Sequence, residues 1–160
     1  MIFVTVGTHE QPFNRLLEEI DRLKKDGVLT DDVFIQTGFS TYEPKYCSWK
    51  KFLSYSEMEE YMSKATIVIT HGGPATFMGS ISKGKRTIVV PRQKKYGEHI
   101  NDHQIEFCKK IVKKGFELTV IKDVCDLKNY LNESNIQQVN LNNKRFVHSF
   151  IETIDKLLEK

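Results

Sequence analysis

The stretch that decides the fold spans residues 66–104 and reads TIVITHGGPATFMGSISKGKRTIVVPRQKKYGEHINDHQ. It starts with a β-branched strand that runs into the pair Gly72-Gly73, and this pair opens a helix. A second buried strand over 86–90 leads into a loop crowded with His, Glu, Asp, Asn and Gln. The carboxyl ends of parallel strands face one crevice, where open α/β sheets bind ligands. We therefore expect a polar ligand site at the ends of these two strands.

The alternation of strand and helix extends in both directions from this stretch. Predicted strands cover 2–6, 33–37, 49–53, 65–70, 86–90 and 117–120, and predicted helices cover 12–25, 56–64, 74–82, 98–114, 123–131 and 142–160. Pro12 suits the first position of its helix, and Ser56 with Glu59 predicts a capping box for the next. This pattern predicts an α/β fold, a Rossmann-like, doubly wound, mostly parallel six-stranded sheet with helices on both faces, in one domain over 1–160.

Composition limits the classes of protein to which the chain can belong. The chain has 160 residues and a net charge of +3, and no apolar run approaches the ~18 residues of a membrane span. Residues 1–6 enter a strand directly, unlike a signal peptide. Three cysteines without CxxC spacing favour reduced cytosolic thiols over a disulfide framework or a zinc ribbon. No aromatic-basic stacking surface is evident, so a nucleic-acid partner is not expected.

The Gly72-Gly73 turn is the first candidate for binding chemistry. A helix N-terminus carries about half a positive charge and unpaired amides, and glycine lets an anion approach the backbone closely. Pro74 presets the first helical turn, and Thr76 adds a hydroxyl. The alternative is a tight strand-to-helix turn with no ligand. The chain has no GxxxxGK[ST] and no GxGxxG after its first strand, so neither a P-loop nor a classical NAD site is expected.

Three histidines follow the same two strands. His71 ends the first, while His99 and His103 are four residues apart and share one face of the helix predicted over 98–114. A zinc site needs three or four ligands, and the HExxH glutamate is absent. We therefore expect the rings to be hydrogen-bonding and acid–base groups around a polar ligand, with no metal. Structural hydrogen bonds are the alternative for each ring.

A proton acceptor is predicted directly after the first strand. His9 and Glu10 face the same edge of the sheet as His71. A neutral His9 can accept a proton, and Glu10 can orient it or act itself. Glu10 could instead only complement the dipole of helix 12–25. No G-x-S-x-G elbow appears, so Ser-His-Asp hydrolysis is not expected.

On these motifs the chain resembles the C-terminal, nucleotide-sugar-binding half of the GT-B glycosyltransferases of family 28. The resemblance rests on FVTVGTH over 3–9, QTG over 36–38, ITHGGPAT over 69–76, VVPR over 89–92 and EHINDHQIE over 98–106. It is greatest for single-domain subunits that work with a membrane-bound partner. These are the catalytic subunit of the split N-acetylglucosaminyltransferase of N-glycan assembly, and the β-1,4-galactosyltransferase or glucuronosyltransferase subunits of bacterial exopolysaccharide and capsule synthesis. THEQPF over 8–13 and PRQK over 91–94 are typical of the capsule branch.

The resemblance implies a role for each motif. The amides of Gly72 to Thr76 hold the UDP diphosphate, the loop from Val90 to Arg92 contacts uracil, and Glu98, His99, His103 and Gln104 reach the donor sugar and phosphates. The implied nucleotide-sugar site comprises Gly7, Thr8, His71, Gly72, Gly73, Pro74, Ala75, Thr76, Val90, Pro91, Arg92, Glu98, His99, Asn101, Asp102, His103 and Gln104, with His9 and Glu10 as the catalytic candidates.

One departure from the family pattern concerns the ribose. Many GT-B proteins place a ribose-binding glutamate five or six residues after the glycine pair, and Gly79 stands at about that place here. Ser80, or the loop near Thr8, is the expected replacement.

The resemblance implies an inverting glycosyltransferase subunit. It transfers a hexose, with galactose in first place, from a UDP-sugar to a lipid-linked saccharide in capsule or exopolysaccharide synthesis, with no obligatory metal or other cofactor. A membrane-anchored partner subunit supplies the acceptor domain and recruits the chain from the cytoplasm to the inner face of the membrane. The loop from Tyr42 to Trp49 or the helix from Phe146 to Leu157 is the expected partner contact, and either could equally be core or a self-association surface. The alternatives are a non-catalytic nucleotide-sugar-binding subunit that enhances a separate transferase, and a UDP-sugar epimerase or hydrolase.

Overall fold

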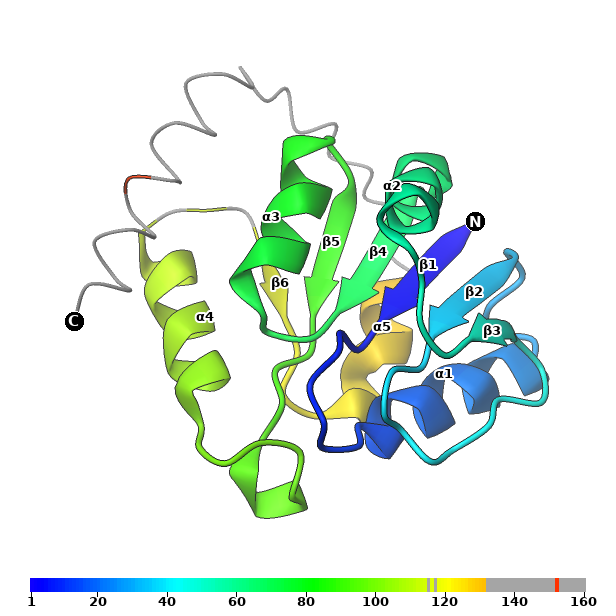
Figure 1. The fold of residues 1–160 in the computed structure, drawn as a ribbon, viewed down its shortest axis with the longest axis horizontal. Helices are drawn as coiled ribbons and strands as arrows, with labels where there is room; N and C mark the ends of the chain where they lie inside the picture. The colour runs from blue at the N-terminus through cyan, green and yellow to red at the C-terminus, as the bar shows by residue number, and fades with distance from the viewer. Residues whose placement is uncertain (115, 117, 132–151, 153–160) are drawn as a thin grey trace.

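The computed structural model describes residues 1–114, 116, 118–131 and 152, and it contains one sheet of six parallel strands (Figure 1). The strands are Ile2–Thr5 (β1), Val33–Gln36 (β2), Ser48–Lys50 (β3), Ile67–Thr70 (β4), Arg86–Val89 (β5) and Thr119–Val120 (β6). Their order across the sheet is β3-β2-β1-β4-β5-β6. The winding direction reverses between β1 and β4, so the crevice expected for a ligand lies beyond the carboxyl ends of these central strands.

Helices cover both faces of the sheet, as Figure 1 shows. They are Asn14–Lys25 (α1), Tyr55–Lys64 (α2), Pro74–Ser82 (α3), His103–Lys113 (α4) and Leu127–Leu131 (α5), with short 3-10 helices at Lys94–Tyr96 (η1) and Val124–Asp126 (η2). The helices α1 and α5 pack on one face, whereas α2, α3 and α4 pack on the other. The predicted doubly wound, parallel architecture is therefore confirmed.

The central strands are buried on both faces because side chains along a strand point alternately to opposite sides. Val4 and Ile69 belong to the core under α1, whereas Phe3 and Val68 belong to the core under α2. A third cluster joins α3 and α4 to β5. The two-sided core fixes the carboxyl ends of β1, β4 and β5 relative to one another, so the loops that follow these strands start from fixed positions.

Two predicted details of the helix starts are wrong. Helix α1 begins at Asn14, so Pro12 precedes it instead of occupying its first turn. The capping box of α2 is formed by Ser54 and Glu57, one Ser-x-x-Glu match earlier than predicted. The sequence contains both Ser-x-x-Glu matches, and the structure uses the earlier one. Glu57 of that match also forms an ion pair with Lys50 of β3, at 2.7 Å.

The helix predicted over 98–114 begins only at His103, because side chains before it bind the backbone locally. Asp102 accepts a hydrogen bond from the backbone N–H of Lys94, and Asn101 accepts one from the N–H of His103. His99 thus precedes the helix. The prediction that His99 and His103 share a helical face is wrong.

Other boundaries differ less. The third strand ends at Lys50 rather than at residue 53, and the segment predicted as one helix over 123–131 is η2 followed by α5. The helix predicted over 142–160 lies outside the described residues.

In the described part of the chain, no helix is long and apolar enough to cross a membrane. Cys47, Cys108 and Cys125 are free, as predicted, and burial raises the pKa of Cys47 and Cys108 to about 12.

Candidate functional site

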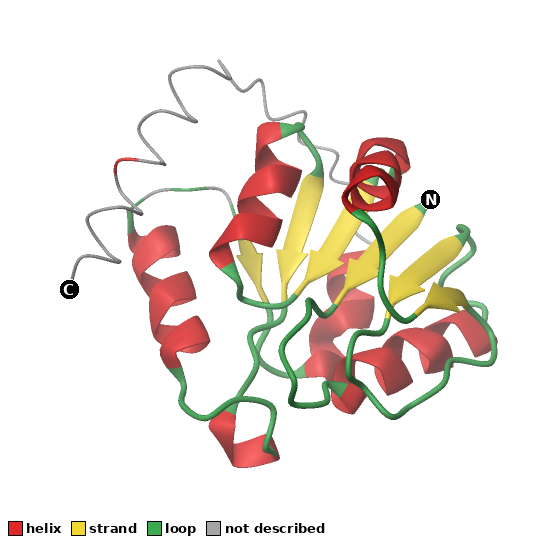
Figure 2. Ribbon diagram, viewed as in Figure 1, coloured by secondary structure: helices red, strands yellow, loops and turns green. Residues whose placement is uncertain are grey.

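Three loops meet at the carboxyl edge of the sheet, after β1, β4 and β5, as Figure 2 shows. Strand β4 pairs with β1 on one side and with β5 on the other. The predicted meeting of two strand ends, β4 and β5, is therefore confirmed, and the loop after β1 joins them. The central element of this edge is the turn after β4, which contains His71, Gly72 and Gly73 and leads into α3.

The His71 ring is enclosed between two glycines, Gly7 from the loop after β1 and Gly73 from its own turn after β4. A Cβ added to Gly7 would lie 2.5 Å from Cε1 of His71. A Cβ added to Gly73 would overlap Nε2 of His71 and lie 2.9 Å from its Cδ2. Gly7 also has a φ of 72°, which glycine adopts without steric cost. Both positions therefore require glycine as long as the ring lies between them.

His71 is a neutral hydrogen-bonding group at physiological pH. Burial lowers its pKa to about 4, and the nearby Arg92 guanidinium acts in the same direction. Its Nδ1 lies 3.3 Å from Oγ1 of Thr70. A neutral imidazole at this position adds no net charge, so any attraction for an anion must come from the backbone amides and from Arg92.

Gln104 connects the turn after β4 to the loop after β5. Its Oε1 accepts hydrogen bonds from the backbone N–H groups of Gly72, at 3.1 Å, and Arg92, at 3.0 Å. Pro74 has no N–H. The amides of the predicted phosphate cradle that remain for a ligand are therefore those of Gly73, Ala75 and Thr76, because the first turn of a helix offers them no partner within the helix.

Arg92 is fully buried and joins the loop after β5 to the loop after β1. Its guanidinium donates to the carbonyl oxygens of Val6 at 2.8 Å, Gln11 at 2.6 Å and Glu98 at 3.0 Å. Burial lowers its pKa to about 10, so it stays charged at neutral pH. Its Nε is buried without a hydrogen-bond partner. Arg92 therefore supplies a fixed positive charge beside His71.

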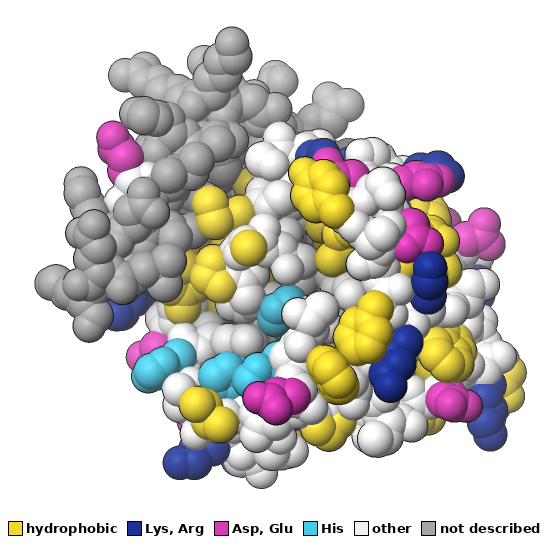
Figure 3. All heavy atoms as spheres, in the orientation of Figure 1, with side chains coloured by type: hydrophobic (Ala, Val, Ile, Leu, Met, Phe, Trp, Pro, Cys, Tyr) yellow, Lys and Arg dark blue, Asp and Glu magenta, His cyan; other side chains and the backbone are white. Residues whose placement is uncertain are grey.

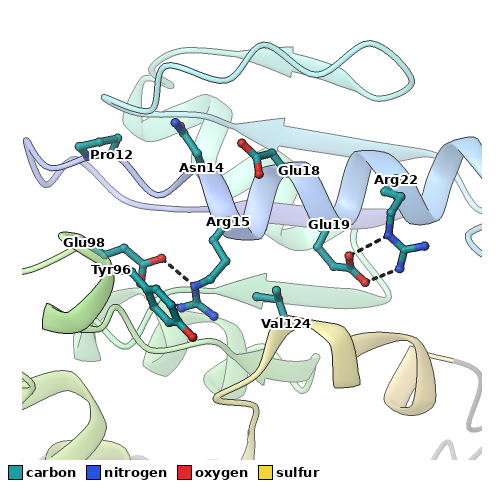
Figure 4. Close-up of a pocket in the computed structure, with 9 residues that line it drawn as sticks. All are labelled: Pro12, Asn14, Arg15, Glu18, Glu19, Arg22, Tyr96, Glu98 and Val124. Carbon is teal, nitrogen blue, oxygen red and sulfur yellow. Dashed lines mark hydrogen bonds and ion pairs between the residues drawn. The ribbon is translucent and has the colours of Figure 1, made fainter.

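Glu98 is also buried, but its carboxylate is directed at protein groups. It accepts from Nε and Nη2 of Arg15, at 2.7 and 2.9 Å, and from the backbone N–H of Gln93. Figure 4 shows the Arg15–Glu98 pair at one end of a pocket. The implied contact of Glu98 with the donor stays a prediction. Arg15 was not predicted from the sequence, because a basic residue on an amphipathic helix normally lies in solvent.

A stacked pair of imidazoles spans the edge of the crevice. The rings of His9 and His99 lie with their centroids 4.6 Å apart and 20° between their planes. His9 follows β1, whereas His99 follows β5, so the pair brings two predicted site segments together. In Figure 3 the histidine side chains (cyan) gather over the loops at this edge of the sheet. Glu10, next to His9 in the chain, is exposed.

The remaining predicted residues divide by exposure. The side chains of Thr8, Ala75, Asp102 and His103 are exposed, whereas Val90 and Pro91 are buried. In the loop before α4, Asn101 accepts a hydrogen bond from the backbone N–H of His103 and Asp102 accepts one from that of Lys94. Uracil recognition by the segment from Val90 to Arg92 can therefore use backbone groups rather than these buried side chains, and it stays a prediction.

One of the two proposed replacements for the ribose-binding glutamate is wrong. Ser80 is fully buried and shares a 2.7 Å hydrogen bond with Oγ1 of Thr87 on β5, so it faces the sheet. The place of the glutamate itself is open, because a Cβ added to Gly79 would meet nothing within 4 Å. The loop near Thr8 remains as the predicted alternative.

Among the described residues, no group of three or more His, Cys, Asp or Glu side chains is arranged to hold a metal ion. A pocket of about 500 Å³ lies between α1, η1 and η2 (Figure 4). Four of its charged side chains form ion pairs, Arg15 with Glu98 and Arg22 with Glu19, and Glu18 also lines it.

Solved structures with the same fold are glycosyltransferases. The glycotransferase of kitacinnamycin superposes with a TM-score of 0.61 at 15% identity, covering 94% of this chain and 38% of that chain. The spinosyn forosaminyltransferase SpnP gives 0.60 at 16% identity, covering 99% of this chain and 43% of the other. SnogD from Streptomyces nogalater gives 0.58 at 13% identity, with 99% and 42% covered. At these identities the likeness shows the fold alone, which is half of a GT-B architecture.

Curated relatives point to the same family. The human UDP-N-acetylglucosamine transferase subunit ALG13 is 31% identical over 123 residues, and its counterpart from Mus musculus is 30% identical over 122. Each alignment covers 71% of this chain, which spans about a tenth of the length of these relatives. The family model described as "Glycosyltransferase family 28 C-terminal domain" matches residues 1–158. The chain therefore belongs to glycosyltransferase family 28, as a C-terminal domain of that family.

Proposed function

We propose that this protein is the donor-binding subunit of an inverting glycosyltransferase that uses a UDP-hexose. The observation that carries the proposal is the fit of the His71 ring between Gly7 and Gly73, at the N-terminus of α3. This fit leaves a backbone-lined surface with the amides of Gly73, Ala75 and Thr76 available. Backbone amides at a helix N-terminus bind phosphate without a metal ion.

The leaving group of the transfer is UDP, whose negative charge grows as the bond to the sugar breaks. The helix dipole of α3 and the fixed charge of Arg92 stabilise that charge in advance, so no obligatory metal is needed. His99, His103 and Gln104 border the place proposed for the donor sugar. His9 or Glu10 accepts the proton of the attacking hydroxyl.

For the donor sugar, galactose is our first candidate because of the capsule-type motifs at 8–13 and 91–94. N-acetylglucosamine is the second, because the curated relatives carry that sugar in their names. The proposed acceptor is a lipid-linked saccharide at the cytoplasmic face of the membrane. A membrane-anchored partner subunit is proposed to supply the acceptor domain and to recruit the chain there.

The second candidate function is a non-catalytic nucleotide-sugar-binding subunit. The open space at Gly79, where a ribose-binding glutamate is missing, favours this alternative.

Turnover discriminates the two functions. The chain, alone and co-purified with its partner subunit, is assayed for release of UDP from UDP-galactose and UDP-N-acetylglucosamine, with acceptor and with EDTA. We expect acceptor-dependent release that survives EDTA and falls more than tenfold in His71→Ala. Lys25→Ala, an exposed change in the last turn of α1 away from this edge, is the matched control and should keep the wild-type rate. Binding of UDP without any transfer by the complex would favour the non-catalytic function instead.

A further inference from the structure

The stacked histidines differ in which nitrogen is free to accept a proton. In His9, Nε2 lies 2.9 Å from Oε1 of Gln11. A carboxamide oxygen only accepts hydrogen bonds, so Nε2 of His9 must carry the hydrogen. The lone pair of a neutral His9 is then on Nδ1. Gln11 thus determines the tautomer of the ring, as the partner of one imidazole nitrogen commonly does.

His99 has the opposite arrangement at Nδ1. The backbone N–H of Asn101 donates to Nδ1 of His99 at 3.3 Å, so this nitrogen must be unprotonated. Protonation of His99 would place two hydrogens against each other. Burial also lowers the pKa of His99, and the neighbouring His9 contributes in the same direction. His99 is therefore held neutral, with its proton on Nε2.

The charged groups around the histidines also distinguish His9 from His71 and His99. The positive charge of Arg92 lowers the pKa of His71 and His99, so it disfavours protonation of these two rings. The carboxylate of Glu98 is bound by Arg15. Glu10 is the acidic neighbour of His9 in the chain, and it is exposed. Among the described residues, Nδ1 of His9 has no hydrogen-bond partner, whereas Nδ1 of His99 accepts from Asn101 and Nδ1 of His71 lies beside the Thr70 hydroxyl.

We propose that Gln11 and His99 are positioning residues that make Nδ1 of His9 the proton acceptor of the transfer. This inference rests on the proposed function. The acceptor oxygen forms its bond to the anomeric carbon, and the bond from that carbon to the β-phosphate oxygen breaks with its electron pair leaving on UDP. The hydroxyl proton moves to Nδ1 of His9. The resulting imidazolium keeps its Nε2–H···Oε1 bond to Gln11 and stacks on the neutral ring of His99, which stabilises the positive charge.

The first test is spectroscopic and needs no turnover. Histidine side-chain nitrogen spectra of the full chain are expected to show the Nε2–H tautomer for neutral His9 and His99. Gln11→Glu keeps the shape of the side chain and adds a charge, so it should raise the titration midpoint of His9 by about one pH unit or more. Gln11→Leu should instead mix the two tautomers. Exposed His103 is the internal control in all three proteins. A His9 midpoint that Gln11→Glu does not move would overturn the proposal.

The second test uses the pH profile of the complex with its partner subunit. The acid limb of kcat should shift upward in Gln11→Glu by the same amount as the His9 midpoint, with KM for the UDP-sugar unchanged. His99→Phe preserves stacking and should lose less kcat than His99→Ala, which should lose about tenfold. An acid limb that stays in place while the His9 midpoint moves would overturn the role of His9. Absence of transfer by the wild-type complex would refute the proposed function, and the spectra would still report whether Gln11 fixes the ring.

Discussion

Two regions of the molecule are each held by one buried charged side chain, and they differ in how completely that charge is satisfied. Asp21 on α1 accepts hydrogen bonds from the hydroxyl of Tyr42 and from the backbone N–H groups of Lys45, Tyr46 and Cys47. Arg92 donates to three carbonyls at the carboxyl edge of the sheet, and its Nε is left without a partner.

Asp21 therefore has a structural role, whereas Arg92 lies in the candidate site and keeps one N–H without a partner. The loop after β2 uses every oxygen lone pair that Asp21 offers to its own donors, and nothing there remains for a ligand. At Arg92 an unpaired buried N–H lies in the region where His71 is enclosed by glycines and where helix amides are free. Unsatisfied polar groups are rare in folded proteins and concentrate at functional sites.

Removal of the arginine should give the largest effect on stability. Arg92→Met leaves three loop carbonyls without their donor, and we expect a loss of about 4 kcal/mol in the free energy of unfolding. Urea unfolding followed by circular dichroism measures it, with exposed Lys94→Met as the matched control. A loss under about 1 kcal/mol would show that water replaces the guanidinium and that Arg92 does not hold the loops.

Asp21→Asn should have a smaller effect, and one that depends on pH. Burial alone raises the pKa of Asp21, but the hydrogen bonds from Lys45, Tyr42 and Tyr46 outweigh it and place the pKa below 3.8. A lowered pKa stabilises the fold above the unfolded-state value, and this stabilisation is lost as pH falls through the folded-state pKa. We expect Asp21→Asn to cost about 2 kcal/mol at pH 7.

The control for the Asp21→Asn prediction is to measure the free energy of unfolding of both proteins at a series of pH values. The difference in unfolding free energy between wild type and Asp21→Asn should stay constant from pH 7 to pH 5 and narrow below pH 4. A difference that does not change with pH would mean that the carboxylate charge contributes nothing and that only the shape of the side chain matters.

The same comparison explains what the sequence could predict. Strand and helix periodicity is a local property, so the parallel sheet and the meeting of β4 with β5 were predictable. Hydrogen bonds between distant residues are not local. Asp21, Arg15 and Arg92 each act on partners in other elements, and no spacing in the sequence indicates them. Helix α4 starts late because Asn101 and Asp102 bind backbone amides, and these residue types do so only in some contexts.

Within the candidate site, the residue types were predictable but their partners were not. The glycine pair and the histidines were evident from the sequence, whereas the enclosure of His71 by Gly7 depends on the pairing of β1 with β4. Gln11 was part of a family motif with no role assigned to it. A His-x-Gln spacing in a loop is compatible with a ring–amide hydrogen bond, and that spacing is the signal that could have found it.

The smallest effect concerns Gly79, the open position in the candidate site. Gly79→Glu restores a carboxylate where many GT-B proteins bind ribose, and the added Cβ meets nothing within 4 Å. We expect UDP to bind about fivefold more tightly, which corresponds to about 1 kcal/mol. The affinity of 2′,3′-dideoxy-UDP, which lacks both ribose hydroxyls, should not change. An equal gain for both nucleotides would show that the variant acts through the helix and not through ribose.

The central claim, a metal-independent diphosphate site between the turn after β4 and the start of α3, is tested most directly by calorimetric titration of UDP. Wild type, Gly73→Ala and Gly79→Ala are compared in the presence of EDTA. The account predicts that wild type and Gly79→Ala bind UDP equally, because a Cβ at residue 79 has open space, and that Gly73→Ala loses at least about tenfold, because its Cβ displaces His71. Equal binding by all three proteins, or no binding by the folded wild type, would contradict it.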